Sequence, residues 1–269
     1  MITRGIAIAS NGMQSLLDMN DSIAHNLANV NTVGYKKAAL TFKSVYEARV
    51  EQPTDQKDIK NTGHRYIGNL SMGSETDRSI IAFTQGTLDR TGNKTDVAID
   101  GDGFFKVKDA DGNIYYTRNG QFTIDSKKRL TTLDGDTVLD INSKPIQIDL
   151  EATNAESSDI VFRENGEIGL SNEKISMTLQ RMAIVDLVDK ENIRSMGNAK
   201  FAPADSQTNQ EIPAVKFKIQ QGALELSNSS TITEMINSIN VSRNYETLSK
   251  LVKEDGDLLT TAINLGRIR

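Results

Sequence analysis

Hydrophobic residues recur in a heptad pattern at both ends of this 269-residue chain, and this feature constrains the fold more than any other. From Ile2 to Val30 the recurring position returns at alternating steps of four and three residues, and one member, Asn20, is polar. Such a repeat is typical of a helix that buries a narrow seam against another helix. The pattern therefore predicts an N-terminal helix whose seam contains Ile6, Met13, Leu16, Asn20, Ile23, Leu27 and Val30.

A second helical pattern begins at Thr231 and continues to the C-terminus, with a change of register near Ser242. A single seam asparagine such as Asn20 commonly fixes the register of paired helices. We expect the C-terminal helix to present Ile232, Met235, Ile239, Leu248, Leu251, Val252, Leu258, Leu259 and Leu265 at an interface.

The energy of these seams indicates that the helices need partners. Burying the six larger N-terminal seam residues is worth roughly 2 kcal/mol each, or about 12 kcal/mol together. That sum is comparable to the whole stability of a typical domain. The helices are therefore expected to pair with each other, with neighbouring copies, or with both. A hairpin within one monomer is the alternative that spacing leaves open.

An amide-rich stretch, "HNLANVNTVGYKK" from His25 to Lys37, follows the N-terminal seam. Its polar side chains can hydrogen-bond the free backbone groups where the chain leaves the helix. Gly34 is placed to adopt the left-handed conformation that often ends helices. An ordinary polar helix end remains the alternative. The side chains concerned are Asn26, Asn29, Asn31 and Thr32.

The middle of the chain predicts a β-rich domain, or two small ones with a break near residues 140–155. Short runs alternate apolar and polar residues, and Asp-Gly, Gly-Asn and Asn-Gly pairs between them are hairpin signals. Residues 50–78 are poor in large apolar side chains and predict a long loop or flexible insertion. The fold class is therefore α+β, with a terminal helical domain formed by 1–35 and 229–269 and a β-rich outer domain over 36–228.

Composition and motifs argue against several classes of function. The net charge is −5, and the sequence lacks the basic patch that nucleic-acid binding needs. No apolar run predicts membrane insertion. Cysteine is absent. "DADGNI" from Asp109 is expected to be a turn, because the loop lacks the glycine and glutamate of a calcium site. No nucleophile and base can be paired. We predict no enzyme activity, no metal and no cofactor.

Four motifs, in order along the chain, resemble the bacterial flagellar basal-body rod and hook protein family. They are "NLANVNTVGYK" (Asn26–Lys36), "QGTLDRTGNKTDVAIDGDGFFKV" (Gln85–Val107), "YTRNGQFTID" (Tyr116–Asp125) and "QGALELSNSSTITEMINSINVSRNYETLSK" (Gln221–Lys250). The resemblance places Asn26, Asn29, Asn31, Thr32, Gly34, Tyr35, Gly101, Gly103, Phe104, Arg243, Tyr245 and Glu246 in family motifs.

The resemblance implies a structural subunit that assembles helically through its terminal helices into a hollow, torque-transmitting rod. It also implies passage through the flagellar type III export apparatus without a cleaved signal, and a place in the periplasmic rod of the basal body. The expected partners are copies of itself and other rod or hook subunits. The rod crosses the cell wall, so peptidoglycan and the surrounding ring proteins are further candidate partners.

Two questions stay open at this stage. The N-terminal "SNGMQSLLDMNDSIAHN" departs from the glutamine-rich "GM-x-A-Q-Q" associated with the distal-rod subunit, which favours a proximal-rod subunit over a distal one. The alternative function, from another class, is a monomeric β-domain module that recognises peptidoglycan or another glycan. The absence of tryptophan argues against it, because glycan platforms usually present aromatic rings.

Overall fold

The computed structural model describes residues 2–45, 47–53, 64–71, 73–148, 160–172, 175–205 and 209–267. The chain forms two compact units. The first unit comprises Met1–His25, Ala39–Ser79 and Ile232–Arg269, and the second comprises Asn26–Ala38 and Ile80–Thr231. Helices form at both ends of the chain and antiparallel strands between them, so the predicted α+β class is confirmed.

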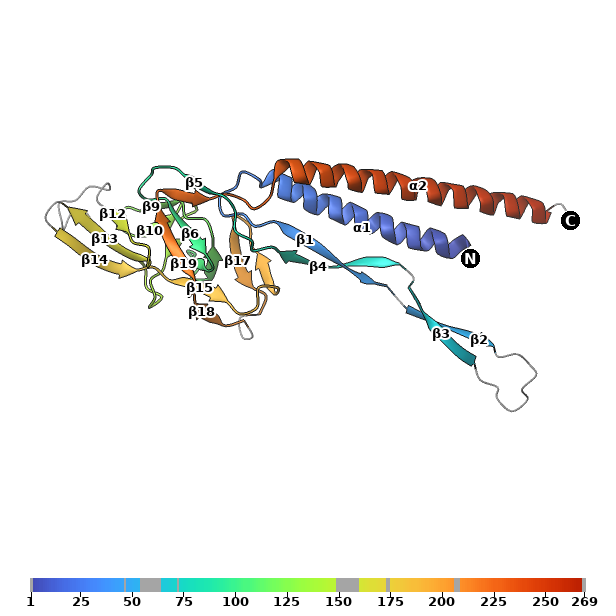
Figure 1. Ribbon diagram of the computed structural model, residues 1–269, viewed down its shortest axis with the longest axis horizontal. Coiled ribbons are helices and arrows are strands. Elements are labelled where there is room, and N and C mark those ends of the chain that lie inside the picture. Colours follow the sequence, from blue (N-terminus) through green and yellow to red (C-terminus); the bar gives the residue numbers. More distant parts are fainter. Residues whose placement is uncertain are drawn as a thin grey trace. The chain divides into compact units, whose positions relative to one another are not determined.

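The first unit contains the two long helices, α1 (Ile2–Ala28) and α2 (Thr231–Arg267), which run side by side (Figure 1). The sequence therefore predicted both helices correctly. The seam prediction extended to Val30, whereas α1 ends two residues earlier. Neither helix has the unbroken apolar length that crossing a bilayer takes, as far as the described residues show.

Strands accompany the helices in the first unit. Strand β1 (Ala38–Ser44) pairs with β4 (Ser74–Ile81), and β2 (Glu47–Pro53) pairs antiparallel with β3 (His64–Ser71). The sequence predicted a loop over 50–78, and part of that range forms strands instead. The strands form because a partner strand satisfies their backbone groups, which does not require large apolar side chains. Of the predicted loop, 54–63 and residue 72 lie outside the described residues.

The second unit is built around a nine-stranded sheet. Seven of its strands lie in the order β16-β17-β8-β7-β11-β10-β9, and β15 joins β7 to β18. The bounds of these nine strands are β7 Phe104–Lys108, β8 Ile114–Thr117, β9 Phe122–Ile124, β10 Leu130–Thr132, β11 Thr137–Val138, β15 Ile184–Leu187, β16 Ile193–Ser195, β17 Lys200–Pro203 and β18 Glu211–Pro213.

Three smaller sheets complete the second unit. One has the order β12-β13-β14, and two are the pairs β19–β6 and β20–β5. Their bounds are β5 Leu88–Arg90, β6 Val97–Gly101, β12 Ile160–Phe162, β13 Glu167–Asn172, β14 Ile175–Arg181, β19 Phe217–Gln221 and β20 Ala223–Glu225. The predicted Asn165-Gly166 turn joins β12 to β13, with Gly166 in the left-handed region at φ 85°.

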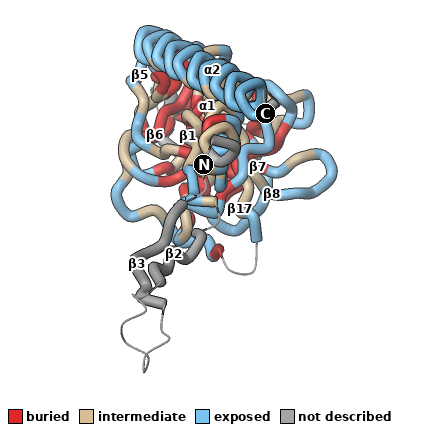
Figure 2. The backbone as a smooth tube through the Cα atoms, turned by 90° about the vertical axis from the view of Figure 1, so that its right-hand side faces the viewer, coloured by how far each residue is buried: buried red, intermediate tan, exposed pale blue. Residues whose placement is uncertain are grey.

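The core of the second unit is built from buried residues of several of these sheets, which Figure 2 colours red. Its larger hydrophobic cluster includes Ile99, Phe105, Leu130, Ile168 and Ile219, each 2% exposed or less. A smaller cluster centres on three phenylalanines packed edge to face: Phe83, Phe104 and Phe201. The strands thus supply two hydrophobic clusters despite the low aromatic content of the chain.

Candidate assembly surface

Two glycines of α1 allow a close approach to α2. A Cβ atom added at Gly12 would lie 3.2 Å from Leu248 Cδ1, and one added at Gly5 would lie 3.1 Å from Asp255 Oδ2. Both distances are tighter than ordinary van der Waals contact, so a large side chain at either position would push the helices apart. The glycines weaken the isolated helix, but they fit the paired one.

The contact between the helices also contains the predicted polar seam residue. The Ser238 hydroxyl donates to Asn20 Oδ1 at 3.2 Å, and Val241, on the same side of α2, is buried. Leu248 follows seven residues after Val241 and therefore continues this row. The row of α2 residues that faces α1 within the monomer includes Leu248. The predicted upstream residues Ile232 and Met235 lie outside this row.

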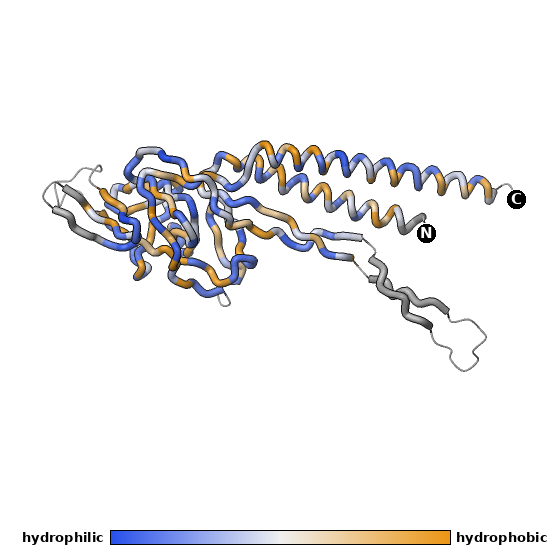
Figure 3. Tube along the Cα trace, viewed as in Figure 1, coloured by the Kyte–Doolittle hydropathy of each residue, from blue (hydrophilic) through white to orange (hydrophobic). Residues whose placement is uncertain are grey.

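Those excluded residues lie on what we call the outer face of α2, defined as Ile232, Met235, Ile236 and Ile239. Their exposed fractions are 72%, 50%, 52% and 53%, respectively. Figure 3 shows hydrophobic residues recurring along both helices, and Figure 2 shows α2 exposed along most of its length. An exposed apolar face of this kind is typical of an interaction site.

The structure places the predicted interface residues at three levels of exposure. Ile23 is buried within the monomer. The half-buried residues are Ile6, Met13, Leu16, Asn20, Leu27, Val30, Leu248, Val252 and Leu259. The exposed residues are Ile232, Met235, Ile239, Leu251, Leu258 and Leu265. The monomer therefore covers much of the N-terminal seam and leaves much of the C-terminal set uncovered.

The amide-rich stretch after α1 belongs to the second unit, where Asn26 has a specific structural role. Its Nδ2 donates to the Ala38 carbonyl at 2.9 Å, while its Oδ1 accepts from the Tyr35 hydroxyl at 2.9 Å and the Ala38 backbone N–H at 3.0 Å. Thr32 Oγ1 donates to Asn29 Oδ1 at 3.2 Å. These bonds fold the stretch back on itself, which is more than an ordinary polar helix end does.

A buried carboxylate, Glu225, ties this stretch to the segment that leads into α2. Its side chain is 0% exposed and contacts two cations, Lys36 Nζ at 2.5 Å and Arg118 at 3.1 Å. It also accepts from the Gly86 backbone N–H at 2.9 Å, and its backbone carbonyl accepts from the Gly34 N–H at 2.7 Å. We call Glu225, Lys36 and Arg118 the root triad, because it joins the chain just after α1 to the chain just before α2.

Both cations of the root triad have further partners. Lys36 Nζ donates to the Thr84 carbonyl at 2.8 Å, and Arg118 donates to the Gly101 carbonyl at 2.9 Å while its guanidinium lies 5.3 Å from the Phe104 ring centre. Burial lowers the pKa of the Lys36 ammonium, and its attraction to Glu225 opposes this shift. Because two buried cations share one carboxylate, removing Glu225 would leave both positive charges buried without a counter-charge, which would be strongly destabilising.

Comparisons with known proteins identify the chain. The family model described as the flagellar hook protein FlgE/F/G D1 domain matches residues 98–170, and that of the flagellar basal body rod FlgEFG protein C-terminal region matches residues 220–265. The flagellar basal-body rod protein FlgG of Borreliella burgdorferi is 32% identical over 272 residues, which cover 98% of this chain and 99% of that protein. This chain belongs to the flagellar basal-body rod protein family.

Further relatives extend the match. FlgG of Bacillus subtilis is 28% identical over 98% of this chain and 99% of its own length. FlgF of Caulobacter vibrioides is 28% identical over 92% of each chain. Membership in this family of structural proteins makes the rod protein a non-enzyme, as predicted, and implies assembly with other rod subunits.

The predicted motif residues of the rod protein fall into two groups. Most of the N-terminal and central members lie in the second unit near the root triad, where Phe104 packs under Arg118. Gly34 is left-handed, at φ 70°, but it lies six residues beyond the end of α1 and does not cap the helix as predicted. Glycine is required at this position because a Cβ atom added there would lie 2.4 Å from the Asn119 backbone nitrogen. The C-terminal members, Arg243, Tyr245 and Glu246, are exposed on α2.

Sequence reasoning missed the root triad itself. Lys36 and Arg118 stand in the quoted motifs, yet nothing in their spacing indicates a shared carboxylate, because 189 residues separate Lys36 from Glu225. The available signal was a single glutamate in the otherwise apolar run "ALEL". The turn at Asp109 is confirmed by the Gly112 N–H, which donates to the Asp109 carbonyl at 3.0 Å. The described residues contain no group of three or more potential metal ligands.

Proposed function

We propose that this rod protein is an axial subunit that assembles helically through its terminal helices, and that the outer face of α2 packs against other subunits. The observation that carries the proposal is the exposure of Ile232, Met235, Ile236 and Ile239 on a helix whose opposite side already contacts α1. The hairpin alternative accounts only for the side that faces α1. Subunits joined by such head-to-tail contacts form an open helical array.

Covering this face would contribute favourable free energy to assembly. Each of the four side chains is at least half exposed, and covering it is worth about 1–2 kcal/mol. Four such contacts supply about 4–8 kcal/mol per subunit before the cost of association. Leu251, Leu258 and Leu265 add further apolar area along the same helix. We infer that these residues, with the half-buried members of the N-terminal seam, form the subunit interface.

For the position in the rod, we propose the distal, FlgG-type place. The departure of the N-terminal helix from a glutamine-rich pattern predicts a proximal subunit. The relatives named FlgG are 26–32% identical and those named FlgF are 27–28% identical, and the highest of these identities, over 98% of this chain, is to a FlgG, which supports the distal place. Complementation tests this: the gene should restore motility to a strain that lacks FlgG and not to one that lacks FlgF. The reverse pattern would establish the proximal place.

The remaining features of the proposal are those that the family resemblance implies. We propose that the terminal helices form the axial core domain and the β-rich segment the outer domain, with boundaries near residues 35 and 229. The rod is hollow and transmits motor torque, and its subunits leave the cytosol through the flagellar type III export apparatus without signal cleavage. Contact with peptidoglycan or the surrounding ring proteins would then involve the outer domain.

A matched pair of substitutions tests the assembly surface. Ile236→Glu places a charge on the outer face, whereas Val215→Glu makes the same change at a 90% exposed residue of the second unit. We expect both variants to fold, and only Ile236→Glu to abolish rod completion and motility. Normal motility with Ile236→Glu would refute the proposed interface, and its monomer circular dichroism shows whether the helices remain formed.

A further inference from the structure

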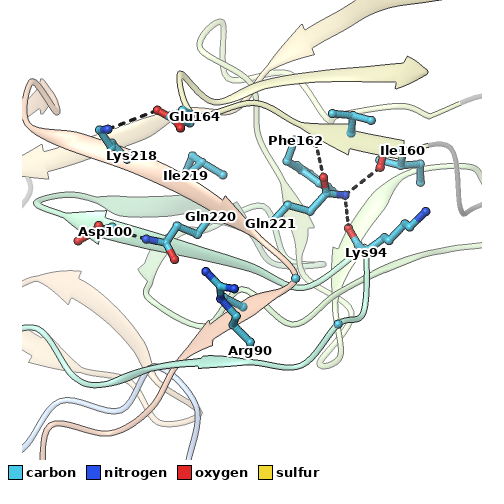
Figure 4. A pocket seen from close by; sticks show the side chains of 14 residues that line it. Arg90, Lys94, Asp100, Ile160, Phe162, Glu164, Lys218, Ile219, Gln220 and Gln221 are labelled. Carbon is cyan, nitrogen blue, oxygen red and sulfur yellow. Dashed lines mark hydrogen bonds and ion pairs between the residues drawn. The ribbon is translucent and has the colours of Figure 1, made fainter. Parts of the chain in front are cut away.

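The side chain of Gln221 occupies the place of a missing strand beside β12. Strand β12 pairs with β13 on one edge, and within the described residues no strand pairs with its other edge. There the Phe162 backbone N–H donates to Gln221 Oε1 at 3.2 Å, and Gln221 Nε2 donates to the Ile160 carbonyl at 2.8 Å (Figure 4). The primary amide thus bonds the same pair of backbone groups that the N–H and C=O of one residue in a neighbouring parallel strand would bond.

Both hydrogens of this amide are used. Besides the Ile160 carbonyl, Gln221 Nε2 donates to the Lys94 carbonyl at 2.8 Å, so both of its hydrogens have acceptors. Two carbonyls flank the nitrogen and one N–H faces the oxygen, which fixes the orientation of the amide. A carboxylate of the same shape could accept from Phe162 but would face two carbonyl oxygens.

The position of Gln221 in the chain gives these bonds a wider consequence. Gln221 ends β19, and Gly222 turns the chain at φ 71° into β20, whose last residue is Glu225 of the root triad. One chain segment therefore holds β12 through Gln221 and the N-terminal stretch through Glu225. The bond also joins the two family-matched regions, because Phe162 lies in the D1 match and Gln221 in the C-terminal match.

We propose that Gln221 is a positioning residue that attaches the β12–β13–β14 sheet to β19, the strand that continues through Gly222 into β20. In the described part of this edge one backbone bond accompanies it, from the Ile219 N–H to the Glu164 carbonyl at 3.0 Å. The separation that Gln221 spans contributes to an open groove of about 870 Å³, lined on one side by β12 and on the other by β19. Its neighbour Gln220 points away and donates to Asp100 at 3.2 Å (Figure 4).

Amide hydrogen exchange in the full-length subunit tests this inference. In Gln221→Glu the two carbonyl oxygens repel the introduced carboxylate and should displace it from Phe162, so the protection factor of the Phe162 amide should fall about tenfold at pH 7. Acidification should restore the protection, because a protonated carboxyl again offers one donor and one acceptor. Gln221→Ala should lose protection at every pH. Gln220→Glu is the matched control and should leave the Phe162 amide unchanged.

The pH-dependent rescue separates a positioning role from general destabilisation. A variant that merely weakened the unit would lose protection across the core and would not regain it in acid. If Gln221→Glu retains wild-type protection at Phe162 at pH 7, or changes it no more than Gln220→Glu does, the inference is wrong. Loss without recovery on acidification would equally overturn the proposed donor role of the amide.

Discussion

Replacing the Glu225 carboxylate by an amide tests the root triad most severely. Glu225→Gln preserves the shape of the side chain but leaves two cations, Lys36 at 0% and Arg118 at 4% side-chain exposure, without their counter-charge. Removing one partner of a buried ion pair costs about 3–5 kcal/mol. We expect at least that loss in the free energy of unfolding of the second unit, a large share of the 5–15 kcal/mol typical of a domain.

The assay is urea unfolding of the soluble subunit, monitored by tyrosine fluorescence because the chain has no tryptophan. A loss of this size should lower the midpoint by roughly 1–2 M urea. Glu164→Gln is the matched control, since its pair with Lys218 spans 3.5 Å with both side chains more than 65% exposed. Exposed pairs contribute little, so we expect the control to lie within about 0.5 kcal/mol of wild type.

Two results would refute this reasoning. A Glu225→Gln variant within 1 kcal/mol of wild type would show that the buried cations do not depend on the carboxylate, against the roughly 3–5 kcal/mol expected. A double variant that also carries Lys36→Met should be less damaged than the sum of the two single losses, because it removes one stranded charge. Strict additivity would mean that the two residues do not interact energetically.

Three further predictions follow from the same structure. Deleting residues 1–25 should leave a protease-resistant β unit, whereas deleting 1–38 should abolish that resistance because it removes the bonded stretch; equal resistance would contradict the assignment of this stretch to the second unit. Gly256→Ala should raise the helical circular dichroism of α2 and stabilise it by up to about 1 kcal/mol, because no atom lies within 4 Å of an added Cβ; unchanged helicity would contradict this. Burial and the hydrogen bond to Glu211 raise the pKa of Tyr116 above its ordinary value of 10, so its stabilisation is complete below pH 10 and declines above it, by up to about 1.4 kcal/mol per pH unit. Tyr116→Phe should be less stable at pH 7 but should lack this alkaline slope, and an identical slope in both proteins would refute the titration of Tyr116.

The helices were predictable because their information is local. Heptad spacing from Ile2 and from Thr231 is visible over a few turns, and the structure forms helices in both segments. Turns at Asp109 and Gly166 were predictable for the same reason, since a tight turn depends on adjacent residues. What local spacing could not assign was the side of α2 that faces α1, because both sides carry apolar residues.

The paired strands β1–β4 and β2–β3 were not predictable because they are poor in large apolar side chains, and the root triad was not predictable because its members lie far apart in the sequence. Strands β3 and β4 pair with β2 and β1, and low hydrophobicity alone made this region resemble a loop. Glu225 meets Lys36 across 189 residues, and a buried ion pair leaves no periodic trace. The same holds for Gln221, because a side chain that bonds the edge of a distant strand leaves no local pattern in the sequence.

The central claim is that the outer face of α2 is covered by other subunits in the assembled rod. The chain has no cysteine, so Ile236→Cys supplies a single thiol at a residue that is 52% exposed in the monomer. Maleimide labelling should be rapid on the soluble subunit, blocked in purified basal bodies, and recovered when the same particles are denatured. Equal labelling rates in the subunit and in intact basal bodies would contradict the account.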